Sequence, residues 1–231
     1  MPKHGKKHQK VLEQVDPAKL YEVQEAISFL QNNKRSKFDE TADLAIRLGV
    51  DPTKSDQMVR GTVSLPHGTG KDVRVVVFAT GPAAEQAREA GATEVGFEDL
   101  IEKVKGGWTE MDVVVATPEA MKEVRKLGKV LGPRGLMPNP KTGTVTDDTA
   151  SAVTQFKAGR VEFRMDRQGN VMVPFGKLSF TKEALEENCN AIVKALVAAK
   201  PAAAKGIYIK RCTLSSTMGP GLHVDVRDEA A

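Results

Sequence analysis

Residues 128–146 bring together residue types that suit the binding of a negatively charged molecule. Glycine and proline recur at short intervals. Because proline fixes φ and glycine permits positive φ, we expect a rigid, solvent-facing loop rather than a helix or strand. Between positions 122 and 141 the only acid is Glu123, whereas the cations are Lys122, Arg125, Lys126, Lys129, Arg134 and Lys141. This composition favours a polyanionic partner.

A second segment, 215–221, has side chains that suit contact with RNA. The hydroxyls of Ser216 and Thr217 and the backbone amides around them can bond a ribose 2′-hydroxyl or a base edge. Met218 can pack on a base or sugar face, and Gly219 allows close approach of the backbone. An ordinary turn is the alternative interpretation.

A third segment, 37–41, places an aromatic ring beside a cation just before a predicted strand. Phe38 could stack on a base while Lys37 contacts a phosphate. Burial of Phe38 in the core is the alternative. Only 5% of the residues are aromatic, so we expect contacts to RNA shape, backbone and 2′-hydroxyls rather than a broad stacking platform.

Enzyme and metal motifs do not fit this sequence. Gly-Thr-Gly-Lys at 68–71 resembles part of a phosphate-binding loop, but Leu65 stands at the first glycine position and Asp72 at the magnesium-binding serine or threonine. The spacing at 132–135 differs from that of a dinucleotide-binding loop. The four histidines are scattered, and no nucleophile, base and oxyanion donor come together. We expect no enzymatic activity, no cofactor and no metal.

The overall composition is that of a globular chain, with a weak bias toward nucleic acid. The 231 residues carry a formal net charge of +4, and acids are spread throughout. The two isolated cysteines, Cys189 and Cys212, make neither a disulfide framework nor a metal-ligand spacing. A reduced, cytoplasmic chain is the simplest interpretation.

The chain begins with a basic segment that includes Lys3, Lys6, Lys7 and Lys10. Val-Leu-Glu follows at 11–13 rather than an apolar run, so we expect no secretory signal, and no later stretch is apolar enough to span a membrane. A solvated, partly disordered arm is one interpretation of this start. Contact with phosphate groups is the other.

Hydrophobic periodicity predicts the elements of both ends of the chain. Asp16 followed by Pro17 predicts a helix start. One face of that helix would consist of Leu20, Val23, Ile27 and Leu30. Alternation predicts strands over 42–48 and 59–65, and a final strand over 206–214. Residues 160–166 and 171–180 are predicted to form a hairpin, followed by a helix with the apolar face Leu185, Cys189, Ile192 and Leu196.

The middle of the chain has a different hydrophobic pattern. Continuous apolar runs at 73–79 and 113–116 alternate with helices predicted over 82–90, over 97–104 and from Pro118 onward. Short continuous strands that alternate with helices indicate a parallel sheet covered on both faces.

These patterns predict an α/β fold class with two domains. Residues 1–67 and 159–231 would form one discontinuous α+β sandwich, because neither flank alone has enough strands for a stable core. Residues 68–158 would form an inserted Rossmann-like domain.

Five motifs resemble the bacterial type of the ribosomal protein L1 family, in the family's order along nearly the whole chain. They are KFDET at 37–41, KSDQ at 54–57 with VRG at 59–61, LPHGTG at 65–70, GPRGLMPNPK at 132–141 and STMG at 216–219. Met172 and Phe175 depart from the family's pattern, in which histidine and isoleucine are common at these positions. The resemblance implies the same two-domain fold.

The resemblance also implies a non-enzymatic constituent of the large ribosomal subunit, cytoplasmic and monomeric when free. The implied partners are the 23S rRNA stalk, exit-site tRNA, the protein's own operon mRNA, which it would repress, and other large-subunit components. The implied rRNA contacts are Lys37, Phe38, Thr41, Lys177, Ser216, Thr217, Met218 and Gly219. Lys129, Arg134 and Lys141 are candidates for a secondary RNA contact, with packing between the domains as the alternative.

Two other function classes are open to this sequence. A nucleotide-using enzyme would need a mononucleotide site in the middle block, and the failed phosphate motifs speak against it. A protein-binding adaptor would need a large exposed apolar patch, and none is evident in the predicted loops.

Overall fold

The fold was obtained as a computed structural model that describes residues 5–226, apart from the side chains of Ser55 and Lys141. The chain forms two compact units. Met1–Gly70 and Val161–Ala231 form the first, which we call the terminal unit, and Lys71–Arg160 form the middle unit. The terminal unit holds an antiparallel sheet and the middle unit a parallel one, which confirms the predicted fold class. None of the described helices has the length and apolar character needed to cross a bilayer.

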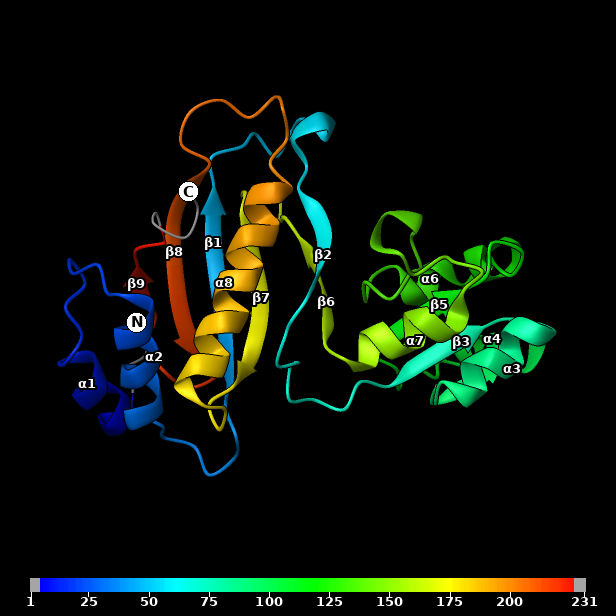
Figure 1. The fold of residues 1–231 in the computed structure, drawn as a ribbon, viewed down its shortest axis with the longest axis horizontal. Helices are drawn as coiled ribbons and strands as arrows, with labels where there is room; N and C mark the ends of the chain where they lie inside the picture. The colour runs from blue at the N-terminus through cyan, green and yellow to red at the C-terminus, as the bar shows by residue number, and fades with distance from the viewer. Residues whose placement is uncertain (1–4, 227–231) are drawn as a thin grey trace. The chain divides into compact units, whose positions relative to one another are not determined.

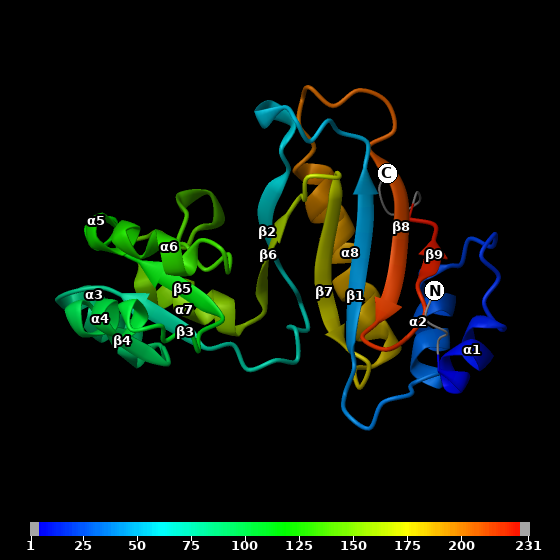
Figure 2. The same ribbon diagram turned by 180° about the vertical axis from the view of Figure 1, so that it is seen from behind.

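Four strands form the main sheet of the terminal unit, and each pairs antiparallel with its neighbours (Figure 1). In spatial order they are β7 (Asn170–Lys177), β1 (Thr41–Leu48), β8 (Ile209–Ser216) and β9 (Leu222–Val224). The alternation predicted for β1 is confirmed, since Leu44 and Ile46 are buried. Helices cover one face of this sheet, and the other face is open in Figure 2.

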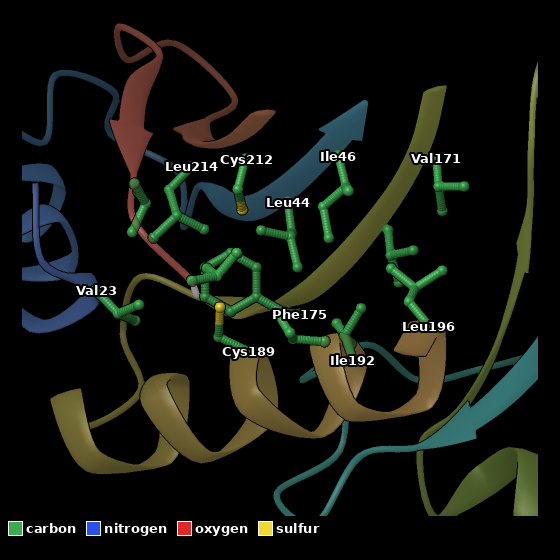
Figure 3. Packing of buried hydrophobic residues seen from close by; sticks show 14 of the residues in the cluster. Val23, Leu44, Ile46, Val171, Phe175, Cys189, Ile192, Leu196, Cys212 and Leu214 are labelled. Atoms are coloured by element: carbon green, nitrogen blue, oxygen red, sulfur yellow. The ribbon is translucent and has the colours of Figure 1, made fainter. Parts of the chain in front are cut away.

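Helix α8 (Lys182–Ala198) packs along β7, and α2 (Val23–Asn32) lies beside it. The Thr181 hydroxyl begins α8 by accepting a hydrogen bond from the Ala184 backbone N at 3.3 Å. The predicted apolar face is confirmed, because all four of its residues are fully buried: Leu185, Cys189, Ile192 and Leu196. In Figure 3 the side chains of Cys189, Ile192 and Leu196 point from the helix toward the strands, and Phe175 lies near them.

The chain before α2 differs from the prediction. Asp16 lies in a turn rather than at a helix start, and the Leu20 side chain is 57% exposed. Tyr21 forms a parallel bridge to Val224 of β9 instead. Because this pairing needs an extended backbone at Tyr21, α2 begins only at Val23.

A separate two-stranded sheet consists of β2 (Arg60–Ser64) and β6 (Arg160–Arg164). The predicted hairpin across 167–170 is confirmed at its turn but not along its strands, since β6 pairs with β2 while β7 pairs with β1. Next to the turn, an antiparallel bridge joins Met165 and Val171, and the backbone N of Asp166 donates a hydrogen bond to the Asn170 carbonyl at 2.8 Å. Alternation shows which residues face inward, but it does not identify the partner strand.

The middle unit is a three-stranded parallel sheet with apolar clusters on both faces, as predicted. In spatial order its strands are β4 (Glu94–Gly96), β3 (Val75–Phe78) and β5 (Val113–Ala116). Val75 and Val77 pack in one cluster, and Val76 and Phe78 in the other, which explains the continuous apolar run. The helices are α3 (Pro82–Glu89), α4 (Glu98–Lys105), α5 (Met121–Val124), α6 (Gly128–Leu131) and α7 (Thr149–Lys157).

The glycine- and proline-rich segment 128–146 is less irregular than expected. It begins with α6, whose Leu131 is fully buried, so the apolar core of the middle unit holds this end of the segment. Two 3-10 turns accompany it, η2 (Arg125–Leu127) and η3 (Pro140–Thr142). A third 3-10 turn, η1 (Ser55–Gln57), lies in the terminal unit.

The basic start of the chain forms a helix, α1 (Lys6–Leu12), where a partly disordered arm was one expectation. Val11 is buried and anchors it, and α1 lies alongside α2 in Figures 1 and 2. Lys3 and His4 lie outside the described residues.

Two leucines of the predicted apolar face test the start of α2. Leu30→Ala removes a side chain that is 2% exposed and should lower the free energy of unfolding by about 2–5 kcal/mol. Leu20→Ala, the matched control, should cost less than about 0.5 kcal/mol because Leu20 is exposed. Urea unfolding measures both. Equal losses would contradict a helix that begins at Val23.

Candidate nucleic-acid interface

Three connections meet at one end of the main sheet. Residues 33–40 lead into β1, while 178–181 follow β7 and 217–221 follow β8. Because β1 is antiparallel to both neighbours, its start lies beside their ends, as both ribbon views show. We call this region the sheet-end surface, and it consists of residues 35–41, 177–179 and 216–219.

A β-bulge places Lys177 on this surface. Val171 and Val173 of β7 face the core, so simple alternation would bury residue 177 as well. Next to Ala42 the register between β1 and β7 shifts by one residue, and Lys177 pairs with Thr41 on the outer face. Lys177 Nζ donates a hydrogen bond to Thr41 Oγ1 at 2.8 Å. The bulge thus places a cation beside the first residue of β1.

The segment after β8 is tied to β1 through Thr217. The backbone N of Thr217 donates to the Thr41 carbonyl at 3.0 Å, and the backbone N of Thr41 donates to Thr217 Oγ1 at 3.0 Å. The chain then turns, with Gly219 N bonded to the Ser216 carbonyl at 3.1 Å. A Cβ at Gly219 would lie 2.4 Å from Ser216 Oγ, so only glycine fits this turn without displacing the serine hydroxyl.

Glu40 lies beneath both segments and is 1% exposed. Its Oε1 accepts hydrogen bonds from the Arg35 N at 3.2 Å and from the N and Oγ of Ser36 at 3.0 and 2.8 Å. Its Oε2 accepts bonds from Ser216 Oγ at 2.6 Å and Met218 N at 3.2 Å. One buried carboxylate therefore fixes the loop before β1 and the loop after β8 against each other.

The hydrogen bonds also fix the charge of Glu40. Burial alone would raise the pKa of this carboxyl, but the bonds from Ser216 and Ser36 outweigh that effect and lower the pKa to about 2. Glu40 is ionised at any pH near neutrality. Sequence reasoning missed this role, and the available signal was an acid directly before a predicted strand, a few residues after Arg35, Ser36 and Lys37.

The sheet-end surface leaves two large apolar side chains in water. Phe38 is 54% exposed and Met218 is 51% exposed, so the alternative interpretation of Phe38 as a core residue is wrong. Lys37 beside them is exposed and forms no ion pair within residues 5–226. Rings and thioethers in this setting suit packing against bases and sugars.

Ser216 has a different environment from the other predicted contacts. It is buried, and its hydroxyl is bound to Glu40. The structure therefore uses this hydroxyl to position the loop that carries Thr217 and Met218.

The candidates for a secondary contact belong to the middle unit, whereas the sheet-end surface belongs to the terminal unit. Lys129 and Arg134 are exposed, and Arg134 donates a hydrogen bond to the Thr109 hydroxyl. The side chain of Lys141 lies outside the described residues.

The glycines at 68–71 do not form a phosphate-binding loop. Strand β3, rather than a helix, follows them, and Lys71 Nζ pairs with Asp112 at 2.6 Å. Within the described part of the chain, no three histidine, cysteine or acidic side chains are grouped closely enough to hold a metal ion.

Comparison with known proteins decides between the function classes. Residues 30–220 match the model of the Ribosomal protein L1p/L10e family. The chain belongs to this family. It is 57% identical over 222 residues to the large ribosomal subunit protein uL1 of Clavibacter michiganensis subsp. michiganensis, an alignment that covers 96% of this chain and 97% of the relative. It is 53% identical over 225 residues to uL1 of Lactobacillus delbrueckii subsp. bulgaricus, with 97% of each chain covered.

Membership in the L1p/L10e family makes this chain a ribosomal protein and not an enzyme. The family match includes the whole sheet-end surface and the whole middle unit. Of the two departures from the family pattern, Phe175 is fully buried in the core, whereas Met172 is 69% exposed on the open face of the sheet.

Glu40→Gln tests the junction in this L1p/L10e family member, by which we mean the hydrogen bonds of Glu40 to the loop before β1 and to the loop after β8. The pKa of Glu40 falls from 4.5 to about 2 on folding, so the carboxylate stabilises the fold above pH 4.5, and this contribution is lost as the pH falls toward 2. The loss amounts to about 3 kcal/mol. The amide of glutamine places a donor against other donors, so the variant should be less stable at pH 7 and should lack this acid-dependent loss.

Urea unfolding between pH 2 and 7 measures both effects. Glu13→Gln is the matched control, because Glu13 is exposed at the end of α1 and should leave the profile unchanged. An unchanged acid profile in Glu40→Gln would show that the junction contributes little to stability.

Proposed function

We propose that this protein is a structural constituent of the large ribosomal subunit that binds 23S rRNA directly in the mobile stalk through the sheet-end surface. The observation that carries the proposal is the junction at Glu40, which holds two distant segments as one surface of fixed shape. Membership in the family and the printed names of both relatives, large ribosomal subunit proteins, support it.

The chemistry of this surface suits structured RNA rather than a generic polyanion. Thr217 offers a hydroxyl group that can contact 2′-hydroxyls and base edges, while the backbone amides of residues 217–219 hold the loop in shape through bonds within the fold. Phe38 and Met218 offer exposed apolar faces to bases and sugars. Lys37 and Lys177 stand at the sides, where they can contact phosphates.

We extend the proposal to two further RNAs. The protein assists the release of deacylated tRNA from the exit site, with Lys129, Arg134 and Lys141 of the middle unit as the secondary RNA contact. It also represses translation by binding its own operon mRNA through the sheet-end surface. Since one surface cannot hold two RNAs at once, free rRNA would compete with the messenger and relieve repression.

The decisive experiment is a titration of the protein with the stalk segment of 23S rRNA and with a scrambled hairpin of equal length, over a range of salt concentrations. We expect preference for the stalk segment by about a thousandfold or more, and persistence of that preference as salt rises. Equal and steeply salt-dependent binding of both RNAs would mean that only charge attracts them, and the proposal would fail.

Met218→Ala should weaken binding of the stalk segment by about 1–3 kcal/mol, because the exposed thioether would lose its contact with the RNA. Thr217→Ala should weaken it by a similar amount. Met172→Ala is the matched control, an exposed methionine of the same unit outside the sheet-end surface. Filter binding measures affinity, and thermal unfolding checks the fold. A loss of only a few tenths of a kcal/mol for Met218→Ala would remove this loop from the interface.

Lys37→Ala should have a different signature. A phosphate contact carries no sequence information, so affinity for all RNAs should fall by the same factor and the slope of log K against log salt should decrease by about one. Salt titrations with both RNAs measure this. Loss of affinity for the stalk segment alone would show that Lys37 reads a base.

A further inference from the structure

A hollow of about 590 Å³ with a basic lining opens beside residues 217–219 of the terminal unit. The first turn of α1, residues 5–8, forms one wall, and residues 217–219 form the other. Arg35 completes the lining. The hollow therefore lies next to the segment proposed above to contact rRNA, but its cations come from parts of the chain to which neither the motifs nor the comparisons give a role.

The charges in this hollow are of one sign. Lys6 and Lys7 are exposed, and neither they nor Arg35 form an ion pair with an acid within residues 5–226. No acidic side chain lines the hollow. The side chains that line the hollow therefore favour an anionic ligand.

Arg35 carries an unused hydrogen-bond donor. Its Nε is buried and has no partner in the described part of the chain. A guanidinium presents its donors as a rigid fork that matches a phosphate group, so an unpaired buried Nε at the wall of a basic hollow points to an oxyanion as its partner.

The fold holds these groups in place. The backbone N of Arg35 is bonded to Glu40 Oε1, the carboxylate that also holds Met218. On the other side, the buried Val11 anchors α1 against the terminal unit. Residue 35 and the loop that carries Met218 are therefore bonded to the same carboxylate.

We propose that Lys6, Lys7 and Arg35 form a phosphate-binding subsite for the RNA backbone, next to the contact made by Thr217 and Met218. The subsite rests on the proposed function, because the RNA strand that crosses residues 217–219 must continue past one side of the loop. The two exposed lysines and the guanidinium that line the hollow complement the negative charge of that strand's backbone.

The test uses the full chain with the double variant Lys6→Ala/Lys7→Ala. We expect the slope of log K against log salt for the stalk segment to decrease by about 1.4–1.8, because two phosphate contacts are lost. The preference for the stalk segment over a scrambled hairpin should stay the same. Lys10→Ala is the matched control, an exposed lysine of the same helix that does not line the hollow, and it should change the slope by less than about 0.3.

Arg35→Lys separates geometry from charge. It keeps the positive charge but loses the fork, so the affinity at fixed salt should fall severalfold while the salt slope stays the same. Thermal unfolding of each variant confirms that α1 and the loop remain folded.

The outcomes distinguish the subsite from the proposed function. If the wild-type protein binds both RNAs equally, the proposed function itself is wrong. If the wild type is selective but the double variant keeps its full slope, only the subsite is wrong. The subsite would also be wrong if the slope decreased by the same amount per lysine removed in the double variant and in Lys10→Ala. That result would show that the lysines act through a general electrostatic attraction rather than at a binding site.

Discussion

The carboxylate of Glu40 is the interaction on which the rest of the interface depends. Five donors from two segments that are far apart in sequence converge on its two oxygens in a buried position. A buried charge is tolerated only when it is fully hydrogen-bonded, and each of these donors would be costly to leave unpaired. The two loops therefore cannot move independently, and the surface that they present has one shape before RNA arrives.

The sheet explains why such a junction can form at this position. Antiparallel order brings the start of β1 beside the ends of β7 and β8, and the register pairs Thr41 with Lys177 while Ala42 faces Ser216. The bulge next to Ala42 then moves Lys177 from the core face to the outer face. The buried groups, Glu40 and Ser216, thus hold the loops in position, while the side chains exposed to water are those that could contact RNA.

Periodicity predicted the elements whose apolar residues face a single core. The strand at 42–48 and the helix with Leu185 and Cys189 are of this kind, because burial alone determines them. Periodicity failed where the structure of a segment depended on which distant segment it pairs with. Tyr21 pairs with Val224, so α2 begins late, and β6 pairs with β2 rather than with β7. The motifs located the candidate site, but Glu40 escaped because its five donors are assembled only by the fold.

The ionised state of Glu40 also constrains how RNA can approach. A carboxylate with a pKa of about 2 is a permanent negative charge below the loop, and it would repel a phosphate placed directly above it. The groups bonded to it are neutral hydroxyls and backbone amides, from residues 35 and 36 on one oxygen and from Ser216 and Met218 on the other. This arrangement favours a binding mode in which bases or sugars lie over the loop and the phosphates lie over the cations. Shape and charge thus select the same orientation of the RNA.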